Sequence, residues 1–446
     1  MAGLTEFFNV LGGWVWGPYM LTLLVGTGVF LTLRLFFLQF SMLPLALKMA
    51  FGGHPRNRDP GDITHFQALM TALAATIGTG NIAGVATAVV AGGPGAVFWM
   101  WVTAVFGMAT KYAEGLLAVK YRIVDENGQM SGGPMYYIER GLNMKWLGVL
   151  FAIFGSVAAF GIGSSVRSNS VAQSIQTSFG IDTWITGVVL TTLTAVVILG
   201  GIRSIARVTS VVVPFMAVIY VLGGLVIILM NVDQVLPAFS LIFTDAFTGE
   251  AVAGGALGAV IRYGVARGVF SNEAGMGSAP IAAAAAKTDH PARQALVSMT
   301  GTFLDTIVVC TITGLVLVMG GFYMDGETGA SLTTSTFDAL LPGPGGWIVT
   351  FGLIFFAYST ILGWSYYGEK CFEYLFGARA IILYRIVYTA SVLMGTIVTL
   401  DLVWAASDTF NGLMAVPNLI GLLLLSGVVV KETKDFKARR ASGELY

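Results

Sequence analysis

The sequence predicts an all-α integral membrane protein with eleven transmembrane helices, arranged as a five-plus-five inverted repeat behind one extra N-terminal helix. Three observations lead to this prediction: a composition suited to lipid, a one-sided distribution of lysine and arginine, and a repeat at a constant offset. Of the 446 residues, 56% are hydrophobic and only 11% are charged, whereas soluble domains carry about 25% charged residues. Most of the surface must therefore face lipid.

Eleven stretches are apolar enough to span a bilayer, which takes about 20 residues each. They cover residues 18–40, 67–91, 95–120, 146–178, 182–201, 208–230, 250–285, 295–321, 346–371, 379–400 and 404–430. The apolar run from Tyr19 to Phe37 is too long for the core of a cleavable signal, and no basic region precedes it. We therefore expect the first span to be retained.

Basic residues orient these spans. Lysine and arginine gather in the connections after spans one, three, five, seven and nine and in the tail, from Lys431 to Arg440. The opposite connections, near 92–94, 179–182, 231–249, 322–345 and 401–403, contain acidic residues but no lysine or arginine. Because basic connections stay in the cytoplasm, we expect an outside N-terminus and a cytoplasmic C-terminus in the cell membrane.

Composition and motifs exclude several classes of function. The 24 basic and 24 acidic residues balance, so nothing indicates a nucleic-acid partner, and no obligatory protein partner is evident. Cys310 and Cys371 are far apart and indicate no disulfide framework. The sequence has no zinc-protease, nucleophile-elbow, dinucleotide-binding or Walker A motif, so we expect neither an enzyme nor a pump that ATP drives directly.

A repeat relates the two halves of the chain. Gly78-Thr79-Gly80-Asn81 aligns with Gly275-Met276-Gly277-Ser278 at an offset of 197 residues. The same offset carries 95–120, 146–178, 182–201 and 208–230 onto predicted spans. Because the unit has five spans, an odd number, the halves must be inverted. The alternative is a chance recurrence of glycines that pack helices closely.

The repeat divides the chain into four parts and indicates a class of function. The parts are the extra helix and its loop at 1–66, the first repeat at 67–230, the second at 231–430 and a cytoplasmic tail at 431–446. Inverted repeats with helices interrupted at matching positions are typical of the midplane site of a secondary transporter.

The first interruption, around residues 74–84, has the chemistry of a site for a carboxylate and a cation. Gly78 and Gly80 lower the penalty for leaving helical geometry. Unwound backbone is tolerated in a bilayer only beside a cavity or within protein. The freed N–H groups of Thr79, Gly80 and Asn81 would open the next helix segment and favour a carboxylate. The carbonyls of Ala74 to Ile77 would suit a cation; the alternative is a seam of packing glycines.

The second interruption places Ser271, Asn272 and Glu273 at mid-membrane depth. An ionisable residue there is a functional candidate, because a buried charge costs about 2.5–3.5 kcal/mol. Glu273 is open to several roles: it could receive a substrate ammonium, hold a cation, take a proton, pair with Arg262 or Arg267, or brace loosened backbone N–H groups.

Two further segments carry polar groups at membrane depth. Ser359 and Thr360 supply adjacent hydroxyl oxygens of the kind that a hard cation prefers, although such hydroxyls often bond back to their own helix. Span four holds the polar run Ser164, Ser165, Arg167, Ser168, Asn169 and Gln173. We expect that run to line a water path on the outer side, with Arg167 as a gate residue or a structural partner.

Three motifs together resemble the alanine or glycine:cation symporters over essentially the whole chain. They are Gly78-Thr79-Gly80-Asn81-Ile82-Ala83-Gly84, Gly132-Gly133-Pro134-Met135-Tyr136-Tyr137 and Ser271-Asn272-Glu273-Ala274-Gly275-Met276-Gly277-Ser278-Ala279. The resemblance implies sodium-coupled uptake of alanine, with glycine as a second candidate, by alternating access in the lipid bilayer. It also implies the fold of the leucine transporter, with spans two and seven broken.

The resemblance further implies binding residues for Na+ and for the small amino acid. The sodium site would use backbone carbonyls of Ala74, Ile77 and Phe356 and the hydroxyls of Ser359 and Thr360. A second sodium site, in relatives that have one, would use Thr76, Asn81, Ser271 and Asn272. The candidate substrate-binding residues are Gly78, Thr79, Gly80, Asn81, Phe160, Ser271, Asn272, Glu273, Gly275, Met276, Thr360 and Trp364.

Within that set, Met276, Phe160 and Trp364 are the expected walls of the pocket. Span four lacks the tyrosine that closes the pocket of the leucine transporter, so Phe160 or Gln173 would take its place. The alternative function is a proton-coupled carrier of small amino acids that uses Glu273. A passive channel or a sensor is a third interpretation.

Overall fold

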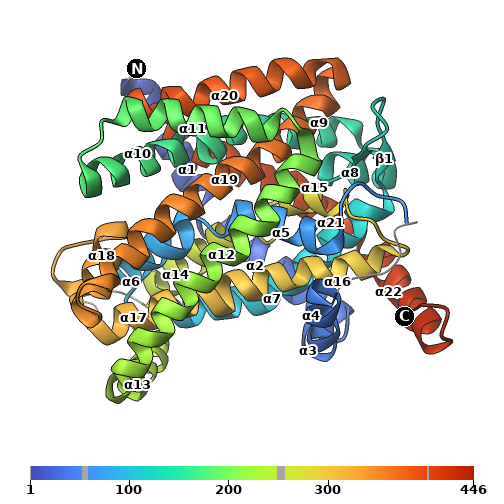
Figure 1. Cartoon of the computed structure of the whole chain (residues 1–446). Coiled ribbons are helices and arrows are strands. Elements are labelled where there is room, and N and C mark those ends of the chain that lie inside the picture. Colours follow the sequence, from blue (N-terminus) through green and yellow to red (C-terminus); the bar gives the residue numbers. More distant parts are fainter. Residues whose placement is uncertain (1, 53–58, 249–256, 399–400, 446) are drawn as a thin grey trace.

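The computed structural model describes residues 2–52, 59–248, 257–398 and 401–445, and these ranges are helical apart from one short hairpin and connecting turns (Figure 1). Six helices there are long and apolar enough to cross a membrane, or up to eight if each sharply bent pair forms one span. The chain is thus built as a multi-pass membrane protein, and the count of eleven spans stays a prediction.

The first part of the chain ends with the 30-residue helix α12. Its elements are α1 (Ala2–Val15), α2 (Pro18–Arg34), α3 (Leu38–Ser41), α4 (Leu43–Phe51), α5 (His65–Thr76), the π segment η1 (Gly80–Gly84), α6 (Val85–Gly92), α7 (Ala96–Lys120), the antiparallel hairpin β1 (Ile123–Val124) and β2 (Met130–Ser131), α8 (Pro134–Leu142), α9 (Lys145–Ala158), the π segment η2 (Ala159–Ser165), α10 (Val166–Phe179), α11 (Thr183–Ile198) and α12 (Gly201–Met230).

The second part of the chain begins with the 17-residue helix α13. Its elements are α13 (Val232–Thr248), α14 (Leu257–Asn272), α15 (Ala279–Ala283), α16 (Pro291–Thr302), the π segment η3 (Phe303–Cys310), α17 (Thr311–Gly320), the 3-10 turn η4 (Phe322–Met324), α18 (Gly329–Leu340), α19 (Pro344–Phe376), the 3-10 turn η5 (Ala378–Ala380), α20 (Ile381–Ile397), α21 (Asp401–Leu424) and α22 (Ser426–Ala441).

Each predicted span has a helical counterpart, although the start of the seventh, at 250–256, lies outside the described residues. The predicted repeat of the two halves and its inversion both remain predictions. The sequence analysis did not anticipate α1, α13 or α18, because these helices lie in stretches too short or too polar to span. It also ran span eleven to 430, whereas α21 ends at Leu424 and α22 leaves at 58°.

Local sequence explains where the helices that form the site begin and end. A capping box starts α5, in which the Thr64 hydroxyl and the Gln67 side chain satisfy each other's backbone N–H groups. The helix stops at Ile77, which is extended, and the chain resumes in η1 at an angle of 54°. π segments often mark functional sites, and η1 lies against η3.

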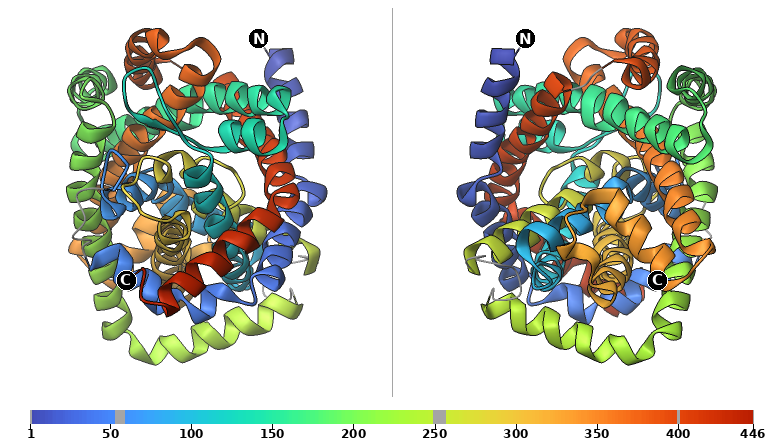
Figure 2. Two further views of the ribbon diagram at one scale, coloured as in Figure 1. Left: turned by 90° about the vertical axis from the view of Figure 1, so that its right-hand side faces the viewer. Right: turned by 90° about the vertical axis from the view of Figure 1, so that its left-hand side faces the viewer.

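The accessory helices pack outside the two halves. In Figure 2, α1 runs along the flank of the molecule beside α21, and the two helices make extensive contact. The next helix, α2, packs on α7 and α21. The extra N-terminal helix is therefore part of the molecule's outer wall rather than of its centre.

Candidate functional site

The first break lies between α5 and η1. The Asn81 side-chain oxygen accepts the Gly78 N–H at 2.9 Å, and the Asn81 N–H donates to the Gly78 carbonyl at 3.2 Å. The sequence analysis predicted three free N–H groups here, but the N–H group of Asn81 is already bonded to the Gly78 carbonyl. The N–H groups of Thr79 and Gly80 therefore remain the candidates to bind a carboxylate.

The two glycines of this break serve close approach, which corrects the conformational role that the sequence analysis gave them. Neither has a positive φ. A Cβ on Gly78 would lie 2.8 Å from the Thr360 hydroxyl of α19, and a Cβ on Gly80 would lie 3.4 Å from the Ser271 Cα of α14. Both neighbouring helices therefore press directly on the backbone of the break.

The second break needs backbone conformations that side chains rarely adopt. Glu273, Gly275 and Gly277 have φ values of 54°, 91° and 86°. Glycine adopts this region at little cost, whereas Glu273 is a left-handed non-glycine residue and persists only when its surroundings hold it.

Glu273 is held by hydrogen bonds on both oxygens. It accepts the Ser278 hydroxyl on one oxygen and the Trp364 indole N–H, at 3.3 Å, on the other. Pairing with Arg262 or Arg267 is therefore wrong: the left-handed turn carries Glu273 off the helix, and the charged partners that act on it are Lys111 and Arg167. Both donors belong to side chains, so the bracing of loosened backbone N–H groups by Glu273 stays a prediction.

A buried carboxylate that the sequence analysis missed holds the backbone of this break. One oxygen of Glu114, on α7, accepts the N–H groups of Gly275 and Gly277 at 3.1 Å each and the Asn418 amide at 2.7 Å. Asn418, on α21, also donates to the Gly275 carbonyl and accepts the Tyr137 hydroxyl. An acidic residue inside the apolar span 95–120 was the signal that could have found Glu114.

The predicted sodium site comes together between α5 and α19. The Ser359 hydroxyl lies 3.3 Å from the Ala74 carbonyl and 2.9 Å from the Phe356 carbonyl, which also accepts the Thr360 hydroxyl at 2.8 Å. Ile77 ends α5 one turn further on. Both hydroxyls bond back to their own helix, as the alternative interpretation expected, and they stand at the broken end of α5.

The predicted second sodium site gathers around a further residue that was missed, Asp305 on η3. Its carboxylate accepts the Asn81 amide, the Ser271 hydroxyl and the Thr306 hydroxyl, each at 2.8 Å. Asn272 joins through Thr306 at 3.2 Å. The sequence analysis considered acidic residues in the connections and at the second interruption, and so passed over this fully buried one within span eight.

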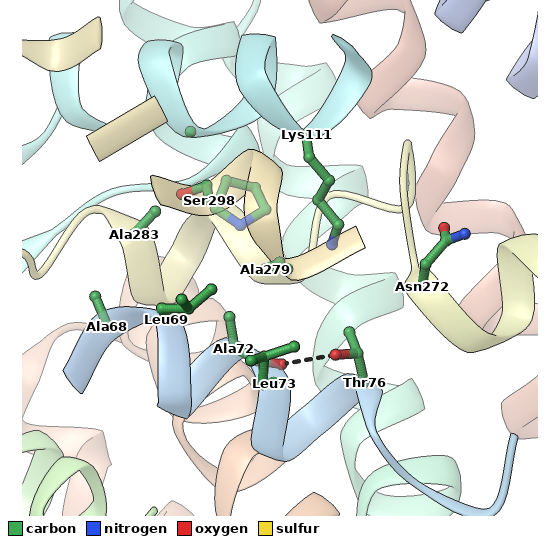
Figure 3. Close-up of a pocket in the computed structure, with 13 residues that line it drawn as sticks. Ala68, Leu69, Ala72, Leu73, Thr76, Lys111, Asn272, Ala279, Ala283 and Ser298 are labelled. Atoms are coloured by element: carbon green, nitrogen blue, oxygen red, sulfur yellow. Dashed lines mark hydrogen bonds between the residues drawn. The ribbon is translucent and has the colours of Figure 1, made fainter. Parts of the chain in front are cut away.

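Thr76, the fourth residue predicted for that second site, faces a small cavity beside it. The cavity measures about 20 Å³, room for one water, and lies between α5, α7, α15 and α16. Figure 3 shows Lys111 reaching into it from α7, with Thr76 and Asn272 on its rim. The Lys111 ammonium has no hydrogen-bond partner among the described residues, and Glu114, Glu273 and Asp305 act on its charge.

The expected pocket walls separate into two groups. Trp364 lies at the second break, since it bonds Glu273, and it also packs on η2, where a Cβ on Gly163 would be 2.5 Å from the Trp364 Cβ. Phe160 instead packs on Tyr384 and Tyr388 of α20, with ring centroids 5.3 and 6.0 Å apart. Met276 is buried within the second break, and its role as a wall stays a prediction.

The polar run of span four is largely explained by contacts with α20. Ser164 and Ser165 bond Ser391, and Asn169 bonds the Gly395 carbonyl at 3.0 Å. Arg167 is the exception: its guanidinium carbon lies 3.9 Å from a Cβ built on Gly78, so this side chain reaches the first break. Among the polar residues of this run, Arg167 is therefore the one that reaches the first break. Its polar neighbours Ser164, Ser165 and Asn169 instead form hydrogen bonds with α20.

Two broken helices that meet at buried polar clusters define the class of secondary transporters with discontinuous helices. Among solved structures, the chain resembles MhsT in complex with L-phenylalanine, with a TM-score of 0.55 and 14% identity over 84% of this chain and 98% of that one. At this identity the likeness shows the fold alone, which is leucine-transporter-like.

A sequence profile described as the "Sodium:alanine symporter family" matches residues 1–445. The chain is 65% identical to the sodium/alanine symporter AgcS of Methanococcus maripaludis, over 97% of both chains. It is 54% identical to an uncharacterized transporter of Haemophilus influenzae, over 98% of this chain and 97% of that one. The chain therefore belongs to the sodium:alanine symporter family, and these relatives are named as transporters rather than enzymes.

Proposed function

We propose that the chain carries alanine, and glycine as a second candidate, into the cell together with sodium by alternating access. Membership of the family and the name of the Methanococcus relative support the pair of substrates. The observation that carries the proposal is the meeting of the Ser359 and Thr360 hydroxyls with the broken carbonyl end of α5. Oxygen ligands of this kind suit a hard cation.

The first sodium would bind the carbonyls of Ala74, Ile77 and Phe356 and the two α19 hydroxyls. The substrate carboxylate would then meet the N–H groups of Thr79 and Gly80 next to it, at the start of η1. The substrate ammonium would meet carbonyls or side chains in 270–275. A second sodium would bind the cluster of Asn81, Ser271 and Asn272, and the buried Asp305 carboxylate strengthens the case for a cation there.

The proposed topology places the four sequence parts in the cell membrane, with 1–66 as an accessory helix and loop, 67–230 and 231–430 as inverted repeats, and 431–446 as a cytoplasmic tail. The one-sided distribution of lysine and arginine supports an outside N-terminus and a cytoplasmic C-terminus. We call the side of the basic connections the basic-loop face.

Uptake of labelled alanine into proteoliposomes tests the proposal. With sodium outside and potassium inside, we expect alanine to accumulate against its gradient, and with potassium on both sides we expect no accumulation. Uptake that ignores sodium but follows a pH gradient would favour the proton-coupled alternative that uses Glu273. Equilibration without accumulation would indicate a passive channel.

Replacing Thr360 by alanine tests the sodium site itself. We expect the sodium concentration for half-maximal uptake to rise at least about tenfold, because one oxygen ligand is lost. Thr389→Ala is the matched control, since Thr389 on α20 makes the same bond to the carbonyl four residues earlier. Unchanged sodium dependence in Thr360→Ala would remove this hydroxyl from the site.

A further inference from the structure

A second charged pocket lies outside the two breaks, where α1, α14 and α21 meet. Its volume is about 230 Å³, and its lining includes Asn9, Trp16, Arg262, Arg267, Phe270 and Asp408. One water takes about 30 Å³ of liquid, so the pocket has room for a small organic molecule. The accessory helix α1, which neither repeat contains, forms one of its walls.

The pocket is lined by two guanidinium groups and one carboxylate that do not form ion pairs with one another. Arg262 and Arg267 lie over the rings of Tyr263 and Phe270, at 6.0 and 5.7 Å from the ring centres. Neither guanidinium has a hydrogen bond or ion pair within the described part of the chain. The Asp408 carboxylate forms no ion pair with either arginine among the described residues, and the Trp16 indole N–H lies beside it and donates to the Asp408 carbonyl at 3.2 Å.

One aromatic ring separates this pocket from the first break. Phe270 lines the pocket, and a Cβ on Gly80 would lie 3.5 Å from the Phe270 ring. The next residue, Ser271, already bonds Asp305 in the polar cluster. The pocket is thus directly beside the place where the substrate carboxylate is proposed to bind.

The pocket lies on the side away from the basic-loop face. Span seven follows the predicted connection 231–249 and span eleven follows the predicted connection 401–403, both on the side that carries no lysine or arginine in its connections. In the proposed topology this is the outer side. A ligand that enters from the outside would therefore encounter this pocket before it reaches the breaks.

We propose that this pocket is an outer binding site for a zwitterionic amino acid. Arg267 and Arg262 would hold its carboxylate in the two-pronged geometry that guanidinium groups favour, and Asp408 would hold its ammonium. The identity of the ligand rests on the proposed function, whereas the site itself rests on the charges and volume of the pocket. The accessory helix completes the site by closing it with Asn9 and Trp16.

Counting bound molecules tests the site. Equilibrium binding of labelled alanine to the purified full chain in saturating sodium should give about two molecules per chain for the wild type. Arg267→Gln and, independently, Asp408→Asn should each lower this to about one and raise the alanine concentration for half-maximal uptake about tenfold. The control is Arg379→Gln, because Arg379 is exposed on the basic-loop face.

The outcomes separate this proposal from the proposed function. Thr360→Ala should keep the molecule that depends on Arg267 while the sodium-dependent molecule weakens. If sodium alters binding in no variant but Arg267→Gln still removes one molecule, the symport proposal fails and the outer site stands. Equal stoichiometry and equal uptake kinetics in the wild type and both pocket variants overturn the outer site.

Discussion

At the scale of single residues, charge and hydrogen bonding inside the membrane decide what each side chain can do. Glu273, Glu114 and Asp305 are all buried carboxylates, and each one accepts hydrogen bonds from a broken segment. Buried polar groups are costly when unpaired. Glu114 therefore holds unwound backbone N–H groups directly, whereas Glu273 and Asp305 hold side chains at the breaks.

Glu114 gives the most direct test of this bracing role. Glu114→Ala would leave three buried donors without an acceptor, and each such group costs about 1–3 kcal/mol. We expect a clearly lower melting temperature for the purified protein, with a smaller drop for Glu114→Gln, whose amide oxygen can still accept. Glu126→Ala is the control, since Glu126 is exposed in the β1–β2 hairpin; a melting temperature equal to that of this control would contradict the bracing role.

Some polar residues of the site could be predicted from the sequence, whereas others could not. Asn81 and Ser271 could be found because they lie beside the glycine breaks, and Ser359 and Thr360 because adjacent hydroxyls stand out in an apolar span. Glu114 and Asn418 act on a break that lies more than 140 positions away in the chain. Such pairings depend on how helices pack, and no local pattern in one sequence specifies them.

At the scale of helices, the breaks are shaped by how closely their neighbours approach. Helix α19 lies against α5 so tightly that a Cβ on Gly363 would be 2.8 Å from the Ala75 nitrogen. Glycine occupies one side of each of two contacts here, because Gly363 faces Ala75 and Gly78 faces Thr360. Small residues at such contacts let membrane helices pack backbone to backbone.

Two glycines of predicted span two can show whether glycine is needed there for close packing or for backbone conformation. Gly78→Ala would push its Cβ against the Thr360 hydroxyl at 2.8 Å, whereas Gly84→Ala would meet nothing within 4 Å. We expect Gly78→Ala to raise the sodium concentration for half-maximal uptake at least about tenfold and Gly84→Ala to leave it near wild type. Equal loss in the two variants would instead indicate that the helix needs glycine for its conformation.

The sequence predicted a helix at each apolar span, but it predicted the ends of the helices less accurately. The spans followed from hydropathy because lipid requires long apolar helices. Helices α13 and α18 lie in connections whose composition is mixed; α13 packs on α17 and α7, and α18 packs on α19 and α17. The bend after Leu424 likewise carries no glycine or proline signal at the break itself.

At the scale of the whole molecule, a set of bonds at the basic-loop face joins segments that are far apart in the chain. Arg122 donates to the carbonyls of Ala284 and Ala286 at 2.8 and 2.7 Å and to Pro60 at 2.7 Å. Ile63 pairs with Ala286 in an isolated bridge. These bonds tie the approach to α5 to the end of α15, so the two broken helices are joined on this side.

Removing Arg122 should therefore favour opening toward the basic-loop face. We expect a cysteine at the cavity-lining position 68, introduced as Ala68→Cys, to react faster with a membrane-impermeant maleimide from that face when Arg122→Ala is also present. Cys310 and Cys371 are buried and add little background. In the Arg207→Ala control the rate should not change, and an unchanged rate in Arg122→Ala would show that these bonds do not hold the face closed.

The proposed sodium site between α5 and α19 consists only of neutral carbonyl and hydroxyl oxygens. A zwitterion has no net charge either, so each transport cycle would move the full charge of its sodium through the membrane field. A potential of 100 mV supplies about 2.3 kcal/mol per charge, equivalent to roughly a fiftyfold concentration ratio. A cage without ionised ligands would thus let the cell's electrical potential, and not the sodium gradient alone, concentrate the amino acid.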